Sequence, residues 1–528
     1  MKENFRKNAA LILVLIVICG VCIMFSCRKS GMFIDEIYTY GLSNSHYAPF
    51  LDDCMGGTLE DTLVARQDLL DYVTVNSGEK FDFGSVYYNQ VNDVHPPLYY
   101  WLFNIVSSFT PNVYSKWTGL CLDLVIFMLA VIMLYRLVYK LFGSRDNAVI
   151  AAALYGLSTM GLSTMLMIRM YVLLTLFTVS LAYLIACQMK EPSNRRLPLI
   201  GLNIFLGLMT QYYFVFYAFF LCAAYLIYAL VKKQYKTALF FALWAFAGVG
   251  LLVLVFPACL SHLFADKLVS GSNALENLEA VGQYKGRIVH FCREMGHGLK
   301  AGVWTAAVTA VLLAAGFKKL RAAFREGRIN FDALVIIVPA AVTLIIVALI
   351  SPVVESRYVY NIAPIFITAV SFLIYLAEQS FGSFKNEFTV KKAASVLAML
   401  LALWFARCYP PMYIYPEHAD YNKSLSEFSD SACVYITDNY FAPVTQDLNQ
   451  LLNFNDFFIS GRTDSPALLS YLDEKGSSEC VVYVDRDPYW SSGFVPEKIM
   501  EELLSSTDYS SYENIYCYGL SAAYLLRK

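Results

Sequence analysis

Charged residues are scarce in this chain of 528 residues. Asp, Glu, Lys and Arg together make up 16% of it, whereas 58% of the residues are hydrophobic. Soluble domains carry about a quarter of their residues as charged side chains, so the composition excludes a single water-soluble globule and a disordered chain. A basic excess is also absent, because 40 Lys and Arg stand against 42 Asp and Glu, and we expect no nucleic-acid partner. The sequence therefore indicates a polytopic membrane protein with some water-facing parts.

About eleven apolar runs are long enough, or nearly long enough, to cross a membrane as helices. A spanning helix needs about 20 mostly apolar residues, because inside lipid every backbone N–H and C=O must be paired within the segment. The run over Leu197–Val231 is too long for one span, and we divide it near Gln211 into two short ones. The other predicted spans are Ala9–Cys27, Trp117–Tyr139, Ala148–Ile168, Tyr171–Met189, Ala238–Cys259, Ala301–Phe317, Ala333–Ile350, Tyr360–Ala377 and Ala393–Phe405.

The Lys and Arg residues collect in every second connection between these runs. Short loops that carry positive charge stay in the cytoplasm. The alternation therefore predicts an integral protein of the plasma membrane with a cytoplasmic N-terminus and, after an odd number of spans, an extracytoplasmic tail from about Cys408. A cleaved signal peptide is the alternative for Ala9–Cys27. That run is long for a signal peptide, and no small-x-small cleavage site follows it.

Two long segments outside the predicted spans define the domain organisation. We expect a membrane domain over residues 1–407, with a first extracytoplasmic loop over residues 28–96, and a second domain over residues 408–528. Within the loop, four apolar residues recur at near-helical spacing among charged ones and predict an amphipathic helix on the membrane surface. These residues are Leu59, Leu63, Leu70 and Val73. A helix that only caps the bundle is the alternative.

The tail has the pattern of a small α/β domain. Short β-rich runs alternate with helix-like stretches, which predicts a partly parallel sheet. The β-rich runs cover residues 433–437, 456–459 and 480–484, and the helix-like stretches cover residues 444–452, 465–473 and 496–505. The tail has no Gly-rich phosphate-binding motif and no CxxC pair. We therefore assign it neither catalysis nor a metal finger.

An acidic pair stands close to the end of the first span. Asp35 and Glu36 follow that span by about eight residues, within an apolar and aromatic stretch. Partial burial would raise the pKa of such a carboxyl and would suit it to accept a proton from an alcohol. An ordinary solvated acidic pair is the alternative.

A second polar group precedes the next span. Asp93 and His95 stand just before Pro96 and Pro97, and an aromatic stretch that includes Tyr99 follows. Because the residue before a proline avoids the helical region, the chain is extended here and holds its polar side chains at the boundary of water and lipid. An interfacial anchor of Tyr and Trp with incidental polar neighbours is the alternative.

Two arginines stand at the predicted outer ends of spans. Arg169 lies where one span ends and the next begins almost without a loop, and Arg357 follows Glu355 just after another span. A guanidinium grips phosphate through charge-assisted and often bidentate hydrogen bonds. Snorkelling, or pairing of Arg357 with Glu355, is the alternative.

The order of these motifs resembles a known group of enzymes. Asp-Glu stands in the first outer loop, then His-Pro-Pro-Leu-Tyr-Tyr-Trp, Arg-Met-Tyr at a span junction, a Tyr-Tyr pair between two short spans, and a late Arg-Tyr. This pattern is similar to that of the GT-C membrane glycosyltransferases, in particular glycosyltransferase family 39. Its relatives include the protein O-mannosyltransferases and the lipid A aminoarabinose transferases. The resemblance covers roughly residues 1–405.

The resemblance implies a GT-C-like helical bundle that transfers a sugar from a polyprenyl-phosphate donor to an acceptor on the outer face, with inversion. It assigns Asp35 as the general base, Glu36 as its partner, and Arg357 with Tyr358 to the donor phosphate. The further residues expected to bind donor phosphate or substrate are His95, Arg169, Tyr171 and Tyr212, with Asp93 and Tyr99 as support. Gln211 departs from the His of many relatives. The tail does not match a β-trefoil domain, so a protein acceptor is not implied.

Two other functions remain open at this point. A transporter of a lipid-linked substrate would carry ionisable residues near the middle of spans and an internal repeat, and a polysaccharide polymerase or ligase would more often have its large loop late in the chain. The sugar, the lipid carrier and the acceptor, which is a glycan, a lipid or a protein, are also open.

No cofactor is implied with certainty, and metal dependence is unknown. Asp35, Glu36, Asp93 and His95 together offer ligands for a divalent metal, but their spacing alone does not show a site. The enzyme hypothesis depends on one geometric expectation, namely that Asp35 and Arg357 meet in a single cavity on the extracytoplasmic side.

Overall fold

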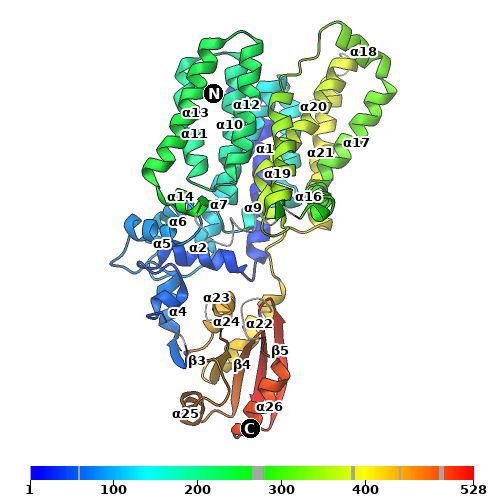
Figure 1. Cartoon of the computed structure of the whole chain (residues 1–528). Helices are drawn as coiled ribbons and strands as arrows, with labels where there is room; N and C mark the ends of the chain where they lie inside the picture. Colours follow the sequence, from blue (N-terminus) through cyan, green and yellow to red (C-terminus); the bar gives the residue numbers. More distant parts are fainter. Residues whose placement is uncertain are drawn as a thin grey trace. The chain divides into compact units, whose positions relative to one another are not determined.

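The computed structural model describes residues 2–57, 60–264, 277–278, 280–381, 387–438, 442–486 and 493–528. These residues form two compact units, both drawn in Figure 1. The helical unit comprises Met1–Cys27, Val94–Tyr99 and Leu120–Met412, and the α/β unit comprises Arg28–Asp93, Tyr100–Gly119 and Tyr413–Lys528. The structure thus groups the first loop with the tail, whereas the sequence suggested one boundary near residue 407.

The helical unit is built from helices joined by short turns. Its elements are α1 (Lys2–Arg28), α7 (Lys116–Phe142), α8 (Arg145–Gly156), α9 (Thr159–Leu166), α10 (Tyr171–Lys190), η1 (Asn194–Arg196), α11 (Leu197–Leu208), α12 (Phe214–Val231), α13 (Tyr235–Val255), α14 (Ala258–Phe264), η2 (Val281–Gln283), α16 (Tyr284–Gly298), α17 (Lys300–Ala315), α18 (Phe317–Arg325), α19 (Leu334–Ile350), η3 (Ser356–Ile362), α20 (Ala363–Phe381) and α21 (Glu387–Cys408). Each predicted span falls on one or two of these helices.

Six helices among the described residues are long and apolar enough to cross a membrane, or up to eight when each of two bent pairs is taken as one span. The number and length of these apolar helices confirm that the chain is an integral membrane protein. The apolar parts of α19 and α21 that the structure describes are shorter than a full span. The number of eleven spans stays a prediction.

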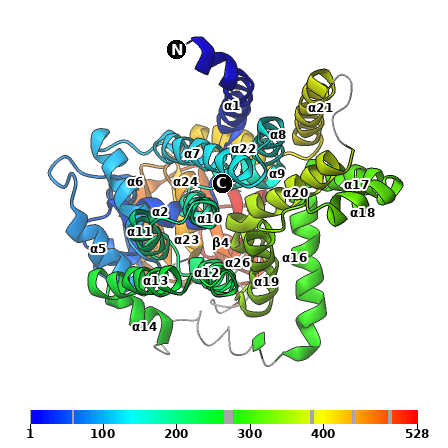
Figure 2. The same ribbon diagram turned by 90° about the horizontal axis from the view of Figure 1, so that it is seen from above.

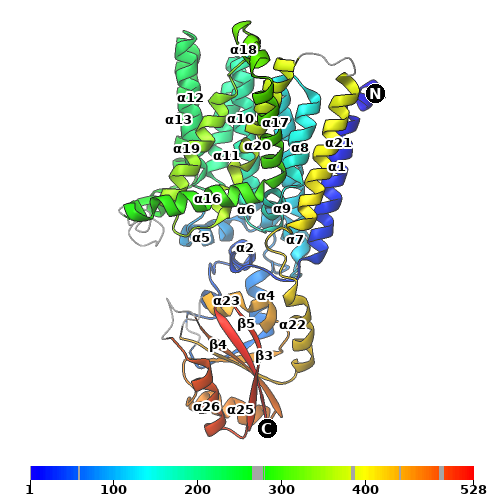
Figure 3. The ribbon, with the colours of Figure 1, turned by 90° about the vertical axis from the view of Figure 1, so that its right-hand side faces the viewer.

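Two bends separate neighbouring helices of the helical unit. The axes of α8 and α9 differ by 58°, and those of α16 and α17 by 90°. At the first bend, Oγ of Ser158 accepts a hydrogen bond of 2.9 Å from the backbone N–H of Gly161 and so caps α9. Figure 3 shows the result of the second bend, because α16 lies across the direction of the long helices.

The α/β unit contains short helices and a six-stranded sheet. Its helices are α2 (Ile34–Asn44), α3 (Leu51–Cys54), α4 (Arg66–Val73), α5 (Phe83–Asn92), most of α6 (Leu98–Phe109), α22 (Glu417–Leu425), η4 (Ser426–Phe428), α23 (Ala442–Gln446), α24 (Leu448–Leu451), α25 (Pro466–Lys475) and α26 (Pro496–Ser506). Its strands are β1 (Thr62–Ala65), β2 (Ala432–Ile436), β3 (Asp456–Ser460), β4 (Glu479–Asp485), β5 (Ser511–Tyr518) and β6 (Ser521–Arg527).

The sheet has the strand order β1-β3-β2-β4-β6-β5. Strand β2 is parallel to both β3 and β4, and the remaining pairs are antiparallel. The three predicted β-rich runs match β2, β3 and β4, so the partly parallel α/β tail is confirmed. Alternate residues of the central strands, such as Val434 and Val482, are buried in a core with Leu468 of α25 and Met500 of α26.

One edge strand comes from the first loop and corrects the predicted amphipathic helix. Leu63 lies in β1, which pairs antiparallel with β3, whereas Leu70 and Val73 lie in the short helix α4. Leu59 lies outside the described residues. The pattern was misleading because the partner of β1 is distant in sequence: Thr62 pairs with Ile459.

The β1–β3 pairing also constrains the membrane topology. One sheet cannot lie on two sides of a bilayer, so the first loop and the tail share one side. An even number of spans must therefore separate Ala65 from Asp456. Ten of the eleven predicted spans lie in this interval, which is an even number.

A buried carboxyl in the α/β unit makes its stability depend on pH. Asp447 is fully buried, and Tyr435 donates a hydrogen bond of 2.7 Å to its Oδ2. Burial raises the pKa of Asp447 to about 7, and the negative charge of nearby Asp485 adds to this. Because the pKa is raised above that of an unfolded chain, the contribution to stability is fully present below about pH 4 and is lost as the pH rises through about 7.

We predict that Asp447→Asn removes this loss, because the amide stays neutral and still accepts from Tyr435. The variant should gain up to about 4 kcal/mol over the wild type at pH 8 and little at pH 4. Urea unfolding of the α/β unit in the full-length protein, followed by pulse proteolysis at both pH values, measures the difference. Asp464→Asn is the control, since the Asp464 side chain is 83% exposed. Equal pH dependence in all three proteins would contradict the prediction.

Candidate active site

Arg357 lies in the helical unit on η3, between α19 and α20, and only 9% of its surface is exposed. Its Nε atom is 3.0 Å from Oε2 of Glu355, so the pairing considered as an alternative is present. Its guanidinium carbon also lies 5.5 Å from the ring centroid of Tyr358. A carboxylate and an aromatic ring thus lie beside the guanidinium of Arg357.

The tyrosine pair between α11 and α12 contacts this segment. The rings of Tyr213 and Tyr358 have centroids 5.1 Å apart. On the other side of the pair, the hydroxyl of Tyr212 lies 2.9 Å from Nδ1 of His262, a buried residue of α14. Sequence reasoning missed His262, because no motif surrounds it in the long segment after α13.

The Arg-Met-Tyr motif around Arg169 also contacts η3, through Tyr171. Arg169 is buried in the break between α9 and α10, and its backbone N–H donates a hydrogen bond of 2.7 Å to the carbonyl of Met167. In the first turn of α10, the ring of Tyr171 meets the ring of Tyr360 edge-on, with centroids 6.3 Å apart. Tyr360 belongs to η3. Two predicted motifs, distant in sequence, are therefore joined at η3.

The segment with His95 is anchored beside the tyrosine pair. The backbone N–H of Leu98 donates a hydrogen bond of 3.0 Å to the carbonyl of Met209, at the end of α11. Tyr99 donates a hydrogen bond of 2.8 Å to Oδ1 of Asp123 on α7, and both side chains are fully buried. Tyr99 therefore holds the segment in place, and His95 lies partly exposed before the anchored residues.

A further buried arginine was not expected from the sequence. Arg287 of α16 donates a hydrogen bond of 2.7 Å from Nε to the carbonyl of Ala348, and one of 3.0 Å from a terminal nitrogen to Oγ of Ser351. These groups lie at the C-terminal end of α19, where backbone carbonyls lack helical partners and the helix dipole favours a cation. Arg287 therefore ties α16 to the segment that leads into η3. In the sequence, only the position of Arg287 on the apolar face of a predicted amphipathic helix could have indicated this role.

In the α/β unit, Glu36 forms a buried ion pair. Its Oε2 lies 2.9 Å from Nζ of Lys29, and neither side chain is exposed. The same oxygen accepts a hydrogen bond of 2.7 Å from the backbone N–H of Phe33, and Lys29 donates one of 2.6 Å to the carbonyl of Tyr413. Glu36 thus caps the first turn of α2 and joins it to the tail. The half-buried Asp35 stands in the same turn, one residue before Glu36.

Two tyrosines surround the buried pair. Burial raises the pKa of Tyr114 and of Tyr415, and the negative charge of Glu36 raises both further. Both hydroxyls therefore stay protonated over the physiological range. Tyr114 donates a hydrogen bond of 2.9 Å to Oδ1 of Asn449, and Nζ of Lys29 lies 5.6 Å from the ring centroid of Tyr415. The surroundings of Glu36 are thus polar, with Lys29 as its ion-pair partner.

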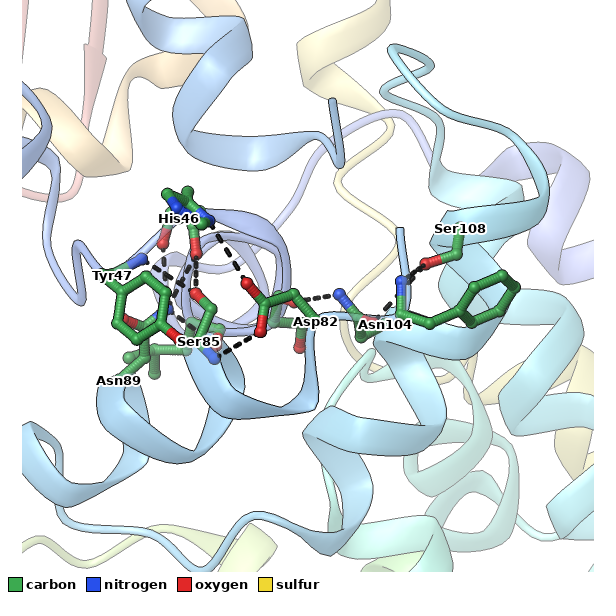
Figure 4. A network of polar contacts seen from close by, with 11 residues as sticks. His46, Tyr47, Asp82, Ser85, Asn89, Asn104 and Ser108 are labelled. Carbon is green, nitrogen blue, oxygen red and sulfur yellow. Dashed lines mark hydrogen bonds and ion pairs between the residues drawn. The ribbon is translucent and has the colours of Figure 1, made fainter. Parts of the chain in front are cut away.

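The other end of α2 is held by a network of polar contacts, shown in Figure 4. Asn104 of α6 donates a hydrogen bond of 2.8 Å to the carbonyl of Ser43. Asn89 and Ser85 of α5 donate hydrogen bonds of 3.0 and 2.9 Å to the carbonyl of Ser45. Both ends of α2 are therefore fixed, which gives the turn that carries Asp35 a defined orientation within the α/β unit.

The helical unit thus brings together four of the predicted segments, those with His95, Arg169, Tyr212 and Arg357. Asp35, Glu36 and Asp93 belong to the α/β unit. The shared cavity of Asp35 and Arg357 therefore stays a prediction. Among the residues that the structure describes, no three His, Cys, Asp or Glu side chains are grouped so that they could hold a metal ion.

We predict that Glu36→Gln destabilises the protein by about 3–5 kcal/mol, because Lys29 then keeps a buried charge without its partner. The double variant Lys29→Met, Glu36→Gln should recover much of the loss, because neither buried charge remains. Unfolding of the purified full-length protein measures both. Glu191→Gln is the control: it breaks an exposed pair with Lys140 of 2.7 Å and should cost much less, because solvent screens exposed ion pairs. Equal losses in Glu36→Gln and Glu191→Gln would contradict the prediction that breaking the buried pair costs more than breaking the exposed one.

Comparison with known proteins agrees with the motifs. A sequence model of the family described as dolichyl-phosphate-mannose-protein mannosyltransferase matches residues 94–261. This confirms the resemblance expected from the sequence over that segment, which contains His95, Arg169, Tyr171 and Tyr212. No curated protein matches the chain in sequence.

Two solved structures are similar to the chain. One is ArnT from Cupriavidus metallidurans bound to undecaprenyl phosphate, at 11% sequence identity and a TM-score of 0.48, over 98% of each chain. The other is the archaeal oligosaccharyltransferase AglB from Archaeoglobus fulgidus, in complex with an inhibitory peptide and a dolichol-phosphate. Its identity is 12% and its TM-score 0.46, over 93% of this chain and 72% of that chain.

Proposed function

We propose that the protein is a membrane glycosyltransferase. It transfers a hexose or pentose from a polyprenyl-phosphate donor to an acceptor hydroxyl on the extracytoplasmic face, with inversion at the anomeric carbon. The observation that carries this proposal is the joining of three motifs at η3, through the contacts of Tyr213 with Tyr358 and of Tyr171 with Tyr360. The family match over residues 94–261 supports it.

In the proposed reaction, the site has to stabilise the polyprenyl phosphate that leaves from the sugar donor. As the acceptor oxygen forms its bond to the anomeric carbon, the bond from that carbon to the phosphate oxygen breaks, and the lipid phosphate gains negative charge. Arg357 is suited to this task, because its guanidinium lies beside Glu355 and Tyr358 and is largely removed from water. Charge stabilisation is strongest in such a low-dielectric setting. His95, Arg169, Tyr171 and Tyr212 are proposed to complete the donor site.

The acceptor end needs a base. In this mechanism Asp35 takes the proton of the acceptor hydroxyl as the oxygen attacks, and a positioned carboxylate contributes typically about 10²–10⁴-fold to such a step. Glu36 acts as a positioning residue, because its bonds to Lys29 and Phe33 fix the turn that carries Asp35. Asp93 and Tyr99 are support residues. The proposal places the α/β unit outside the cytoplasm, so that both ends of the reaction share one face.

The purified protein, incubated with a panel of labelled polyprenyl-phosphate sugars and candidate acceptors, tests the proposal. We expect transfer of label from one donor class, with release of the polyprenyl phosphate. A parallel series with a chelator determines whether a divalent metal takes part. The absence of labelled product from every donor would contradict the enzyme assignment and favour transport.

We predict that Asp35→Asn abolishes transfer without loss of the folded protein, because the amide cannot accept the acceptor proton. Turnover is measured with the active donor, and folding by the melting temperature of the purified chain. Asp53→Asn is the matched control, because Asp53 is an exposed carboxylate in the first turn of α3 in the same loop. It should leave turnover unchanged. Normal turnover in Asp35→Asn would exclude the base assignment.

We predict that Arg357→Ala lowers kcat by about 10²–10³-fold, the usual cost of removing one transition-state donor. Arg357→Lys should recover only part of the rate, because an ammonium lacks the planar pair of donors. Arg293→Ala, at an exposed position of α16, is the control and should keep kcat. A rise in the donor KM at unchanged kcat would contradict this prediction, because it would show that Arg357 binds the ground state and the transition state equally well.

A further inference from the structure

Helix α18 follows α17 at the edge of the helical unit. Only Gly316 separates the two helices, and Figure 2 shows both of them beside α20. The outer side of α17 is apolar and strongly exposed, as Val308 and Val311 show, and such a surface is more favourable against hydrocarbon chains than against water. In α18 the buried residue is Ala323, and the other side chains are partly or fully exposed. Helix α18 therefore starts where the lipid-facing surface of α17 ends.

The exposed side of α18 carries an apolar stripe, formed by Phe317, Leu320 and Phe324. These residues are three and four positions apart, and residues with this spacing share one face of a helix. Phe317 and Phe324 are 61% and 60% exposed. The ring of Phe324 meets that of the exposed Phe331 edge-on, with centroids 5.9 Å apart. Uncovered aromatic rings along one side of a helix are typical of helices that lie in a membrane surface.

A cationic stripe, formed by Lys318, Arg321 and Arg325, runs beside the apolar one. Its residues have the same spacing, shifted by one position, which is about 100° around the helix, and all three are exposed. Among the residues that the structure describes, no acidic side chain forms an ion pair with any of them. The acid that follows the helix, Glu326, pairs with Arg328 instead, at 2.9 Å between Oε2 and Nε. The stripe thus presents three positive charges to its surroundings.

Two further cations hold α18 against the end of α20. Nζ of Lys319 lies 5.3 Å from the ring centroid of Phe381, the last residue of α20, which is within the range of a cation–π interaction. Arg328, just after α18, donates a hydrogen bond to the carbonyl of Gln379 in the last turn of α20. Both cations therefore have partners within the protein. Their contacts fix the orientation of α18 in which the cationic and apolar stripes are exposed.

We propose that α18 binds anionic phospholipids of the surrounding membrane. The lipid phosphates lie along the cationic stripe, where lysine and arginine form charge-assisted hydrogen bonds with them. Phe317 and Phe324 insert among the acyl chains next to the apolar surface of α17. The lysines and arginines of this connection predict a cytoplasmic position, and anionic lipids give the cytoplasmic leaflet a negative surface potential that attracts basic segments beside a span. The site does not depend on the glycosyl transfer proposed above.

Other occupants match only one of the two stripes. An acidic peptide or a nucleic acid would cover the cations but would leave the rings of Phe317 and Phe324 in water. A second copy of the chain that docked through the same face would bring three more cations to the cationic stripe. An anionic phospholipid carries a negative headgroup and apolar chains in one molecule, and it therefore matches both stripes.

Hydrogen exchange of the purified full-length protein tests the proposal. The protein is placed in nanodiscs of phosphatidylcholine, or of phosphatidylcholine mixed with phosphatidylglycerol of the same acyl chains. Exchange at the backbone amides of α18 is followed by mass spectrometry, because a lipid that binds the folded helix opposes its local opening. We expect exchange in the anionic nanodiscs to be slower by about fivefold or more, since each cation near an anionic surface strengthens binding by about that factor. Equal exchange in the two kinds of nanodisc would overturn the proposal.

Two variants test the cationic stripe itself. The first neutralises the stripe with the substitutions Lys318→Gln, Arg321→Gln and Arg325→Gln. The control removes three exposed cations at the turn between α12 and α13 and just after it, with the substitutions Lys232→Gln, Lys233→Gln and Lys236→Gln. We expect the lipid-dependent difference at α18 to be lost in the first variant and kept in the control. A difference that survives in the first variant, or that is lost in both, would overturn the role of the stripe. The wild-type comparison decides the proposal by itself if the first variant does not fold.

Discussion

The absence of water inside a bilayer governs where this protein can keep polar chemistry. Backbone groups there must be paired within helices, and charges are expensive, so reactive side chains must stand where helices break. The helical unit follows this rule. Arg169 lies between α9 and α10, Tyr212 between α11 and α12, and Arg357 on the tight turn η3. Each break places a motif at a helix end, and the contacts of Tyr213 and Tyr171 with η3 join the breaks into one cluster.

The α/β unit has a different structural role, because it holds the short helix α2 in one orientation. Helix α2 has only 11 residues, too few to be stable alone in water. Tertiary contacts fix it instead: the Lys29–Glu36 pair at its start, and the hydrogen bonds from Asn89 and Asn104 at its end. A buried ion pair adds little net stability compared with an apolar pair. Its value here lies in specifying one orientation of the turn that carries Asp35.

Local patterns in the sequence predicted much of this architecture. Every predicted span falls on helix, and the three β-rich runs became β2, β3 and β4, because apolar runs and β-branched residues act over a few neighbours. Features that depend on distant partners were missed or misjudged. The spacing of Leu63 indicated a helix, but Leu63 lies in a strand that pairs with the distant β3. His262 and Arg287 contact residues near α12 and α19 that are distant in sequence, so no local pattern predicts these contacts. Likewise, no spacing rule shows that Glu36 binds Lys29 rather than solvent.

The pairing of β1 with β3 also has a consequence for how the protein is made. Strand β1 emerges early in translation, but its partner Asp456–Ser460 follows only after nearly all membrane helices have been inserted. Until then β1 is an open strand edge, which invites aggregation and cleavage. A chain that stalls or is cut short keeps that edge uncovered, whereas a completed chain hides it.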